Sequence, residues 1–203
     1  MKMKKHLVVF ALVVLGLAAM RGLASTTGTN TNTVSPLAAV HVNVQDAIQL
    51  TLATGTGCAV TAGGGTDYSM NFGTVDALAI TAPACGSKFA PITPGTTNAV
   101  YYSDYQLTPI FSSQSVATNT LTAYVSSPFA KATLSIVQSN AAPAGIGNLT
   151  PMSKLVGAQT NIATNAVSGT AMTRYIGVSV APTNGPGMTG ADAATITYTL
   201  TVQ

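Results

Sequence analysis

The end of the chain, residues 194–202, alternates between apolar and polar residues. Threonines occupy the odd positions, and the even positions from 196 are Ile196, Tyr198, Leu200 and Val202. Successive side chains of a β-strand point to opposite faces, so a period of two is typical of a strand with one buried face. The segment therefore predicts a β-strand.

Shorter runs of the same kind recur along the chain, at 40–52, 75–80, 100–107, 120–125, 133–137 and 175–180. Stretches rich in Gly, Pro and Asn separate them and are typical of turns. No stretch after residue 24 combines helical periodicity with capping residues over ten positions. Many short strands joined by turns predict an all-β fold, a single antiparallel sandwich or barrel over residues 53–203.

Residues 1–24 have the features of a secretory signal peptide. Lys2, Lys4 and Lys5 precede an apolar run at 7–20, and small residues follow it. The run is shorter than the ~20 residues of a membrane-spanning helix, so a retained anchor is the weaker alternative. We therefore expect export to an extracellular, cell-surface location and no membrane association after the signal is removed.

Removal of the signal also changes the charge. The whole chain carries +3, but Lys2, Lys4, Lys5 and Arg21 leave with the signal, so four cationic and five anionic side chains remain, a net charge of −1. Charged residues make up only 6% of the chain and 47% of its residues are hydrophobic. This composition argues against nucleic-acid binding and against disorder, and it suits a protein that associates with other copies.

Cys58 and Cys85 are the only cysteines. An even number in an exported protein indicates one disulfide, which would stabilise the fold by about 3–4 kcal/mol on the chain-entropy model. A bridge between subunits and two free thiols are the alternatives.

The sequence offers no convincing catalytic set or metal site. His41 is the only histidine after the signal, Glu is absent, and the five aspartates are scattered, each near a turn or strand edge where a solvated carboxylate is the simpler interpretation. A Ser-His-Asp triad needs a held imidazole, a glycosidase needs two opposed carboxylates, and a metal site needs clustered ligands. We expect no enzyme activity and no cofactor, and a secreted hydrolase is the third-ranked hypothesis.

Two surface features remain open. Tyr101, Tyr102 and Tyr105 form a local aromatic group that could stack on a sugar, although packing against a sheet face is the favoured interpretation. Asn148-Leu149-Thr150 matches a glycosylation sequon, a three-residue pattern that also arises by chance.

Three pieces of the sequence carry a family resemblance. Residues 58–61 read Cys-Ala-Val-Thr, residues 70–76 read Met-Asn-Phe-Gly-Thr-Val-Asp, and Gly190 precedes the alternating final segment. Together they resemble the spore coat U-type domains of archaic chaperone–usher pilins. The resemblance implies an immunoglobulin-like β-sandwich that lacks one strand, which the N-terminal strand of the next subunit supplies.

The N-terminal region fits that scheme. Residues 25–36 are a polar, low-complexity tract expected to be a flexible linker, and residues 37–52 are the expected donor strand. Its apolar positions are Val40, Val42, Val44, Ile48, Leu50 and Leu52. The implied partners are identical subunits in a homopolymer, with a periplasmic chaperone and an outer-membrane usher.

The same alternation has a second interpretation, in which residues 40–52 are the first strand of a secreted monomer. Asp46 interrupts the apolar positions, so the segment is one long strand or two short strands with a kink. The favoured function is a structural subunit of an extracellular filament or pilus that polymerises by strand donation. The alternative is a monomeric secreted adhesin or carbohydrate-binding module that uses residues 101–105 or a loop.

Overall fold

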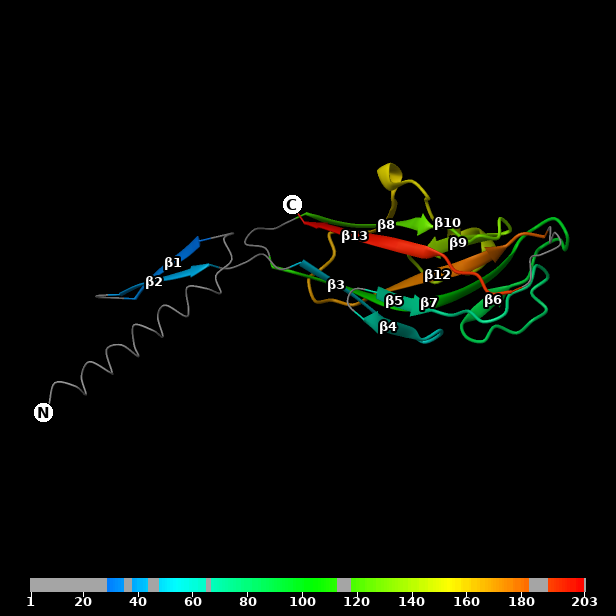
Figure 1. Ribbon diagram of the computed structural model, residues 1–203, viewed down its shortest axis with the longest axis horizontal. Helices are drawn as coiled ribbons and strands as arrows, with labels where there is room; N and C mark the ends of the chain where they lie inside the picture. The colour runs from blue at the N-terminus through cyan, green and yellow to red at the C-terminus, as the bar shows by residue number, and fades with distance from the viewer. Residues whose placement is uncertain are drawn as a thin grey trace, which may run out of the picture. The chain divides into compact units, whose positions relative to one another are not determined.

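A computed structural model describes residues 29–34, 38–43, 48–64, 67–112, 118–182 and 190–202. The chain divides into two compact units, Met1–Ala47 and Ile48–Gln203. Within the described ranges the regular elements are β-strands and two single-turn 3-10 helices, η2 (Ile146–Asn148) and η3 (Val156–Ala158) (Figure 1). None of the helices in these ranges is long and apolar enough to span a membrane.

The N-terminal unit contains an antiparallel hairpin. β1 (Thr29–Val34) pairs with β2 (Ala38–Asn43) at six consecutive positions. The tract expected to be a flexible linker, residues 25–36, therefore contains a strand. Its alternating threonines are the residues that favour this outcome, because Thr has high β-propensity.

The larger unit is built from short strands. In chain order they are β3 (Ile48–Thr54), β4 (Val60–Gly64), β5 (Asp67–Met70), β6 (Ser87–Phe89), β7 (Ala99–Phe111), β8 (Asn119–Ser127), β9 (Leu134–Ser139), β10 (Thr150–Pro151), β11 (Thr160–Thr164), β12 (Met172–Val180) and β13 (Thr195–Val202).

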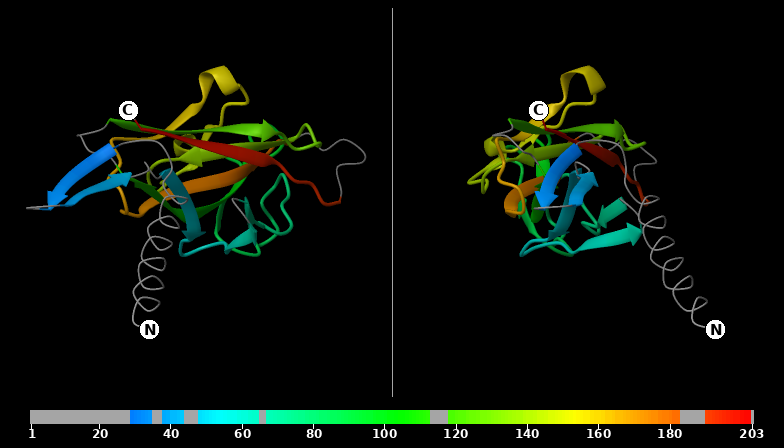
Figure 2. Two further views of the ribbon diagram at one scale, coloured as in Figure 1. Left: turned by 60° about the vertical axis from the view of Figure 1, so that its left-hand side comes forward. Right: turned by 90° about the vertical axis from the view of Figure 1, so that its left-hand side faces the viewer.

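These strands form two main sheets and a separate β4–β5 hairpin, all antiparallel (Figure 2). The larger sheet has the order β10-β9-β12-β7-β3, and β6 also pairs with β7. Because β12 covers one edge of β7 over 99–107, β3 and β6 share its other edge, at 105–111 and 100–102. The smaller sheet has the order β11-β8-β13.

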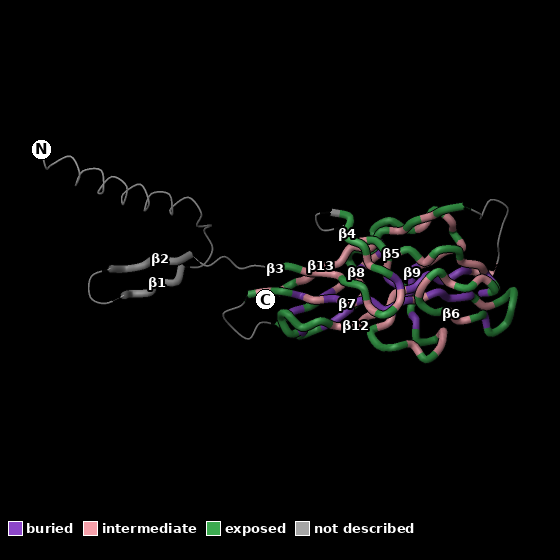
Figure 3. Tube along the Cα trace, turned by 90° about the horizontal axis from the view of Figure 1, so that it is seen from below, coloured by how far each residue is buried: buried purple, intermediate pink, exposed green. Residues whose placement is uncertain are grey.

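The main hydrophobic core lies between the two sheets. Leu107 of β7, Leu121 of β8 and Ile162 of β11 are almost completely buried in one cluster. Figure 3 colours the chain by burial and shows buried residues along β7. Burying a side chain of this size contributes about 1.5–3 kcal/mol. The predicted all-β, antiparallel fold is confirmed, with two sheets packed face to face.

Most of the predicted strands are present. The runs at 100–107, 120–125, 133–137, 175–180 and 194–202 correspond to β7, β8, β9, β12 and β13. The run at 40–52 forms two strands, since β2 ends at Asn43 and β3 begins at Ile48, and residues 44–47 lie outside the described residues.

The strand predicted at 75–80 is wrong, because this segment is a loop. The carboxylate of Asp76 accepts the backbone N–H groups of Leu78, Ile80 and Thr81 at 2.9, 3.1 and 2.7 Å. From the other side, Lys88 Nζ donates to the carbonyls of residues 79, 80 and 81. Backbone groups that a strand would pair with a neighbour are thus bound by two side chains.

Candidate functional site

The last strand, β13, lies at an edge of the smaller sheet. β8 pairs with it along residues 195–202. No other strand of the described ranges pairs with its opposite edge. An edge of this kind presents backbone N–H and C=O groups that can add a further strand.

The core beside this edge is incompletely covered. Ile196 and Leu200 of β13 pack against the core cluster but are only half-buried, whereas Leu121 and Ala123 of the adjacent β8 are fully buried. In β3, at the edge of the larger sheet, Leu52 is likewise half-buried in that cluster. Apolar surface therefore remains exposed along β13 and β3.

A pair of tyrosines places β13 over β7, the neighbour of β3. The hydroxyl groups of Tyr105 in β7 and Tyr198 in β13 lie 2.8 Å apart, and the rings meet edge to face at 6.3 Å. Burial raises the pKa of Tyr105 to about 12 and the pKa of Tyr198 well above its usual value. Both hydroxyls stay protonated at neutral pH and link the two sheets across the core.

The other edge of the smaller sheet, β11, is blocked by side chains. Arg174 Nε donates to the carbonyl of Ile162 at 2.9 Å, and Asn140 Nδ2 donates to the carbonyl of Asn161 at 3.2 Å. Edge carbonyls occupied in this way are poor partners for an added strand. The edge of β13 is therefore the better acceptor for a further strand.

The structure separates the six apolar residues assigned to the donor strand. Ile48, Leu50 and Leu52 lie in β3, which pairs with the chain's own β7. Val40 and Val42 lie in β2 and pair with β1, and Val44 lies outside the described residues. Residues 48–52 thus pair within the chain's own larger sheet, whereas β2 pairs with β1 in a separate two-stranded sheet.

The predicted disulfide is confirmed, because Cys58 and Cys85 are bonded within the chain. It joins the loop after β3 to the segment before β6. The backbone N–H of Cys58 donates to Ser103 Oγ at 2.7 Å, which fastens the bridge to β7. Next to it, Gly86 has φ +72° and lies so close to the backbone of Tyr102 that a Cβ would collide with its carbonyl. Only glycine satisfies both demands there.

Three aspartates fasten loops by accepting backbone N–H groups. Besides Asp76, Asp104 binds the N–H groups of residues 56 and 57 at 2.7 and 2.9 Å, and Asp192 binds those of residues 130, 131 and 193 at 3.1, 2.8 and 2.9 Å. Burial alone would raise the pKa of Asp76 and Asp104, but these donors hold each pKa below its usual value. The N–H of Lys131 is the main cause of the lowered pKa of Asp192. These are structural carboxylates that fasten three different loops, Asp104 from within β7, and they are bound more tightly than the solvated side chains expected from the sequence.

Replacing Asp76 by asparagine is expected to lower the free energy of unfolding by about 2–3 kcal/mol at pH 7, because hydrogen bonds to a charged group are lost. The folded-state pKa lies below the unfolded value, so this contribution is complete above about pH 5 and is lost as the pH falls through the folded-state pKa. Urea unfolding at pH 7, 4 and 2.5 should show the gap between the two proteins closing on acidification. A gap that stays constant with pH would contradict the role of the carboxylate charge.

The tyrosine group does not form a platform for sugars. Tyr101 is completely buried and Tyr105 is 2% exposed. Tyr102 lies on the opposite face of β7 and stacks on Phe89, with ring centroids 4.8 Å apart. The three rings therefore pack against the protein, as the favoured interpretation held.

Two other residues noted in the sequence have separate positions. His41 lies in β2, opposite Thr31 in the hairpin register. Asn148 ends η2 and is exposed, and its Oδ1 accepts the backbone N–H of Ala144 at 3.2 Å. Within the described ranges, no three His, Cys, Asp or Glu side chains gather as metal ligands.

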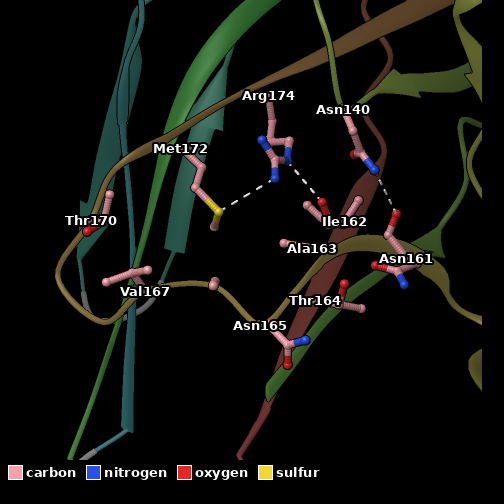
Figure 4. A pocket seen from close by; sticks show the side chains of 11 residues that line it. Asn140, Asn161, Ile162, Ala163, Thr164, Asn165, Val167, Thr170, Met172 and Arg174 are labelled. Atoms are coloured by element: carbon pink, nitrogen blue, oxygen red, sulfur yellow. Dashed lines mark hydrogen bonds between the residues drawn. The ribbon is translucent and has the colours of Figure 1, made fainter. Parts of the chain in front are cut away.

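A groove of about 600 Å³ opens between β11, the loop at 165–170 and the start of β12 (Figure 4). Its floor includes the core residue Ile162, and its rim carries Arg174 and the amides of Asn140, Asn161 and Asn165. These residues are spread over 35 positions of the sequence and form no recognisable sequence motif. The one signal in the sequence is that Arg174 is the single arginine after residue 21.

Comparison of the chain with protein-family models, with curated proteins and with solved structures finds no match. The function must therefore be inferred from the geometry of the described residues.

Proposed function

We propose that the protein is a structural subunit of an extracellular filament that polymerises by donating an N-terminal strand to the next copy. The unpaired edge of β13, beside a half-covered core, carries this proposal. In it, the body is an immunoglobulin-like sandwich that lacks one strand, and the added strand satisfies backbone groups and covers Ile196 and Leu200.

The donor in this proposal is β2 rather than the whole of residues 37–52. Since β3 pairs with β7 inside its own sheet, the donor is confined to residues before Ile48. Among the described residues, β2 pairs with β1 along one edge and with no strand along the other. Val40 and Val42 occupy alternate positions of β2, so they share a face.

The β1 strand has a role in this scheme as well. A two-stranded hairpin is marginally stable in water by itself, so pairing with a third strand would stabilise it. Addition through the free edge of β2 would extend the neighbour's sheet to β11-β8-β13-β2-β1. The outermost strand would then be the polar β1, whose Thr and Asn residues suit a solvent-facing edge.

Donation of this kind joins different surfaces of successive copies. A head-to-tail contact that does not close on itself gives an open fibre. Before assembly the β13 edge would be exposed, so we propose that a periplasmic chaperone covers it and that an outer-membrane usher exchanges the chaperone for the next subunit. Export by the signal at residues 1–24 belongs to the same proposal.

The alternative function is a monomeric secreted adhesin or carbohydrate-binding module that uses residues 101–105 or a loop, and residues 101–105 offer it little surface because Tyr101 and Tyr105 are buried. The deciding experiment compares residues 25–203 with a deletion of residues 25–47, which keeps β3. Negative-stain electron microscopy is expected to show filaments only from the longer protein, while circular dichroism shows both to be folded. Adding a peptide of residues 37–47 to the deletion should raise its Tm. Filaments from the deletion, or monomers from the longer protein, would overturn the proposal.

A further inference from the structure

Arg174, at the rim of the groove beside β11, has a charge that no carboxylate of the groove balances. Its Nε donates to the Ile162 carbonyl at 2.9 Å, one Nη donates to the Thr173 carbonyl at 2.8 Å, and the other Nη lies 3.5 Å from Met172 Sδ. None of these partners is anionic, and none of the residues that line the groove is acidic. The groove therefore presents an unbalanced positive charge.

The guanidinium is also oriented for binding. A guanidinium has five N–H donors, and the two carbonyls and the weak thioether acceptor use three of them. Within the described ranges, the other two donors, one on each Nη, have no protein partner. Paired donors on a planar fork suit a carboxylate, which accepts both in parallel.

Amide groups lie along the groove from this cation. The side chains of Asn161 and Asn165 are exposed and make no hydrogen bonds among the described residues, and both line the groove (Figure 4). Each amide offers donors and an acceptor, the combination that neighbouring sugar hydroxyls need. Val167, 67% exposed, adds apolar surface suited to the C–H face of a ring.

The wall of the groove is held in place before any ligand arrives. The buried side chain of Asn119 donates to the carbonyl of Ala166 at 2.9 Å and accepts its N–H at 2.8 Å. Farther along the loop, Ser168 Oγ accepts the N–H of Phe111 at 2.9 Å and donates to its carbonyl at 2.8 Å. A wall fixed in this way costs little ordering entropy on binding.

We propose that this groove binds an acidic saccharide, with the carboxylate on Arg174 and the ring hydroxyls on Asn161 and Asn165. Its volume of about 600 Å³ falls within the ~300–1,000 Å³ of small-molecule sites. The inference is independent of filament formation, because the groove lies at the blocked β11 edge and not at β13.

The test uses residues 25–203 and four probes in isothermal titration calorimetry: trigalacturonate, its fully methyl-esterified form, acetate and tri-aspartate. The ester keeps the sugar skeleton and removes the charge, so it is expected to bind at least tenfold more weakly than the acid. Acetate is expected to bind far more weakly than the trimer. If the acid and the ester bind equally, the proposed contact between the carboxylate and Arg174 is wrong. If acetate binds as tightly as trigalacturonate, the proposed recognition of the sugar rings is wrong.

Variants locate the binding in the groove. Arg174→Gln is expected to weaken trigalacturonate binding at least tenfold, and Arg174→Lys should recover only part of it because the paired donors are lost. Lys154→Gln, the same charge change at an exposed lysine outside the groove, should stay within twofold.

Replacing Arg174 also removes its hydrogen bond to the Ile162 carbonyl in β11. A second variant that leaves this hydrogen bond in place therefore tests the binding separately. Asn165 has φ +52°, so Asn165→Gly removes the amide without straining the backbone and is expected to weaken binding about fivefold or more. Unchanged binding in folded Arg174→Gln or Asn165→Gly would overturn the proposal. Tighter binding of tri-aspartate than of trigalacturonate would also overturn it, in favour of an acidic peptide.

Discussion

Replacing Val40 and Val42 together by aspartate is expected to abolish filament assembly and to leave the unit Ile48–Gln203 folded. In the proposed contact these alternate positions of β2 enter the neighbour's core. Losing the burial of two valines removes about 3–6 kcal/mol, and two unpaired carboxylates would resist burial further. At 1.4 kcal/mol per factor of ten, the association constant should fall by more than about 100-fold.

A matched control is available in the same strand. Ala39 and His41 occupy the opposite face of β2, so Ala39→Asp with His41→Asp adds the same two carboxylates away from the neighbour's core. Filament mass measured by sedimentation and electron microscopy should vanish for the valine pair and persist for the control pair. Equal loss in both proteins would mean that the negative charge of the segment, and not the buried face, decides assembly.

The sequence predicted a strand correctly where one face of that strand is buried in the core and the other is not. β8 and β13 were predictable because every second residue is apolar and packs in or against the main core. β1 was not, because its Thr and Asn residues are polar on both faces and leave no alternation to detect. The segment 75–80 failed for the opposite reason, since its apolar residues suggested a strand while Asp76 binds the backbone as a loop.

The candidate site was less predictable than the fold. The edge of β11 is blocked and the edge of β13 is open. This difference depends on the strand order of the sheet and on side chains that are distant in sequence from the strand they contact. Arg174 and Asn140 block β11 from positions 12 and 21 residues away in sequence. Sequence periodicity reports burial of a strand's faces and carries no information about its edges, so the acceptor edge emerged only from the topology.

Removing the disulfide by Cys58→Ala with Cys85→Ala is expected to lower the free energy of unfolding by about 3–4 kcal/mol, the chain-entropy value for a loop with a sequence separation of 27. That loop contains β4 and β5, and the side chains of Val60 and Met70 from this hairpin pack on the main core. The same loop contains Asp76, whose carboxylate accepts a hydrogen bond of 3.1 Å from the hydroxyl of Tyr101 in β7.

Those contacts should keep the native structure in place, so the loss should arise from greater freedom of the unfolded chain. Urea unfolding of the double variant and of the wild type under reducing conditions should therefore give the same lowered stability, with far-UV circular dichroism unchanged at zero urea. If the loss exceeds about 5 kcal/mol or the β4–β5 hairpin becomes sensitive to protease, the bridge instead holds the native loop against β7. A loss below about 1 kcal/mol would mean that residual structure already restricts the unfolded chain between these positions about as strongly as the covalent bond does.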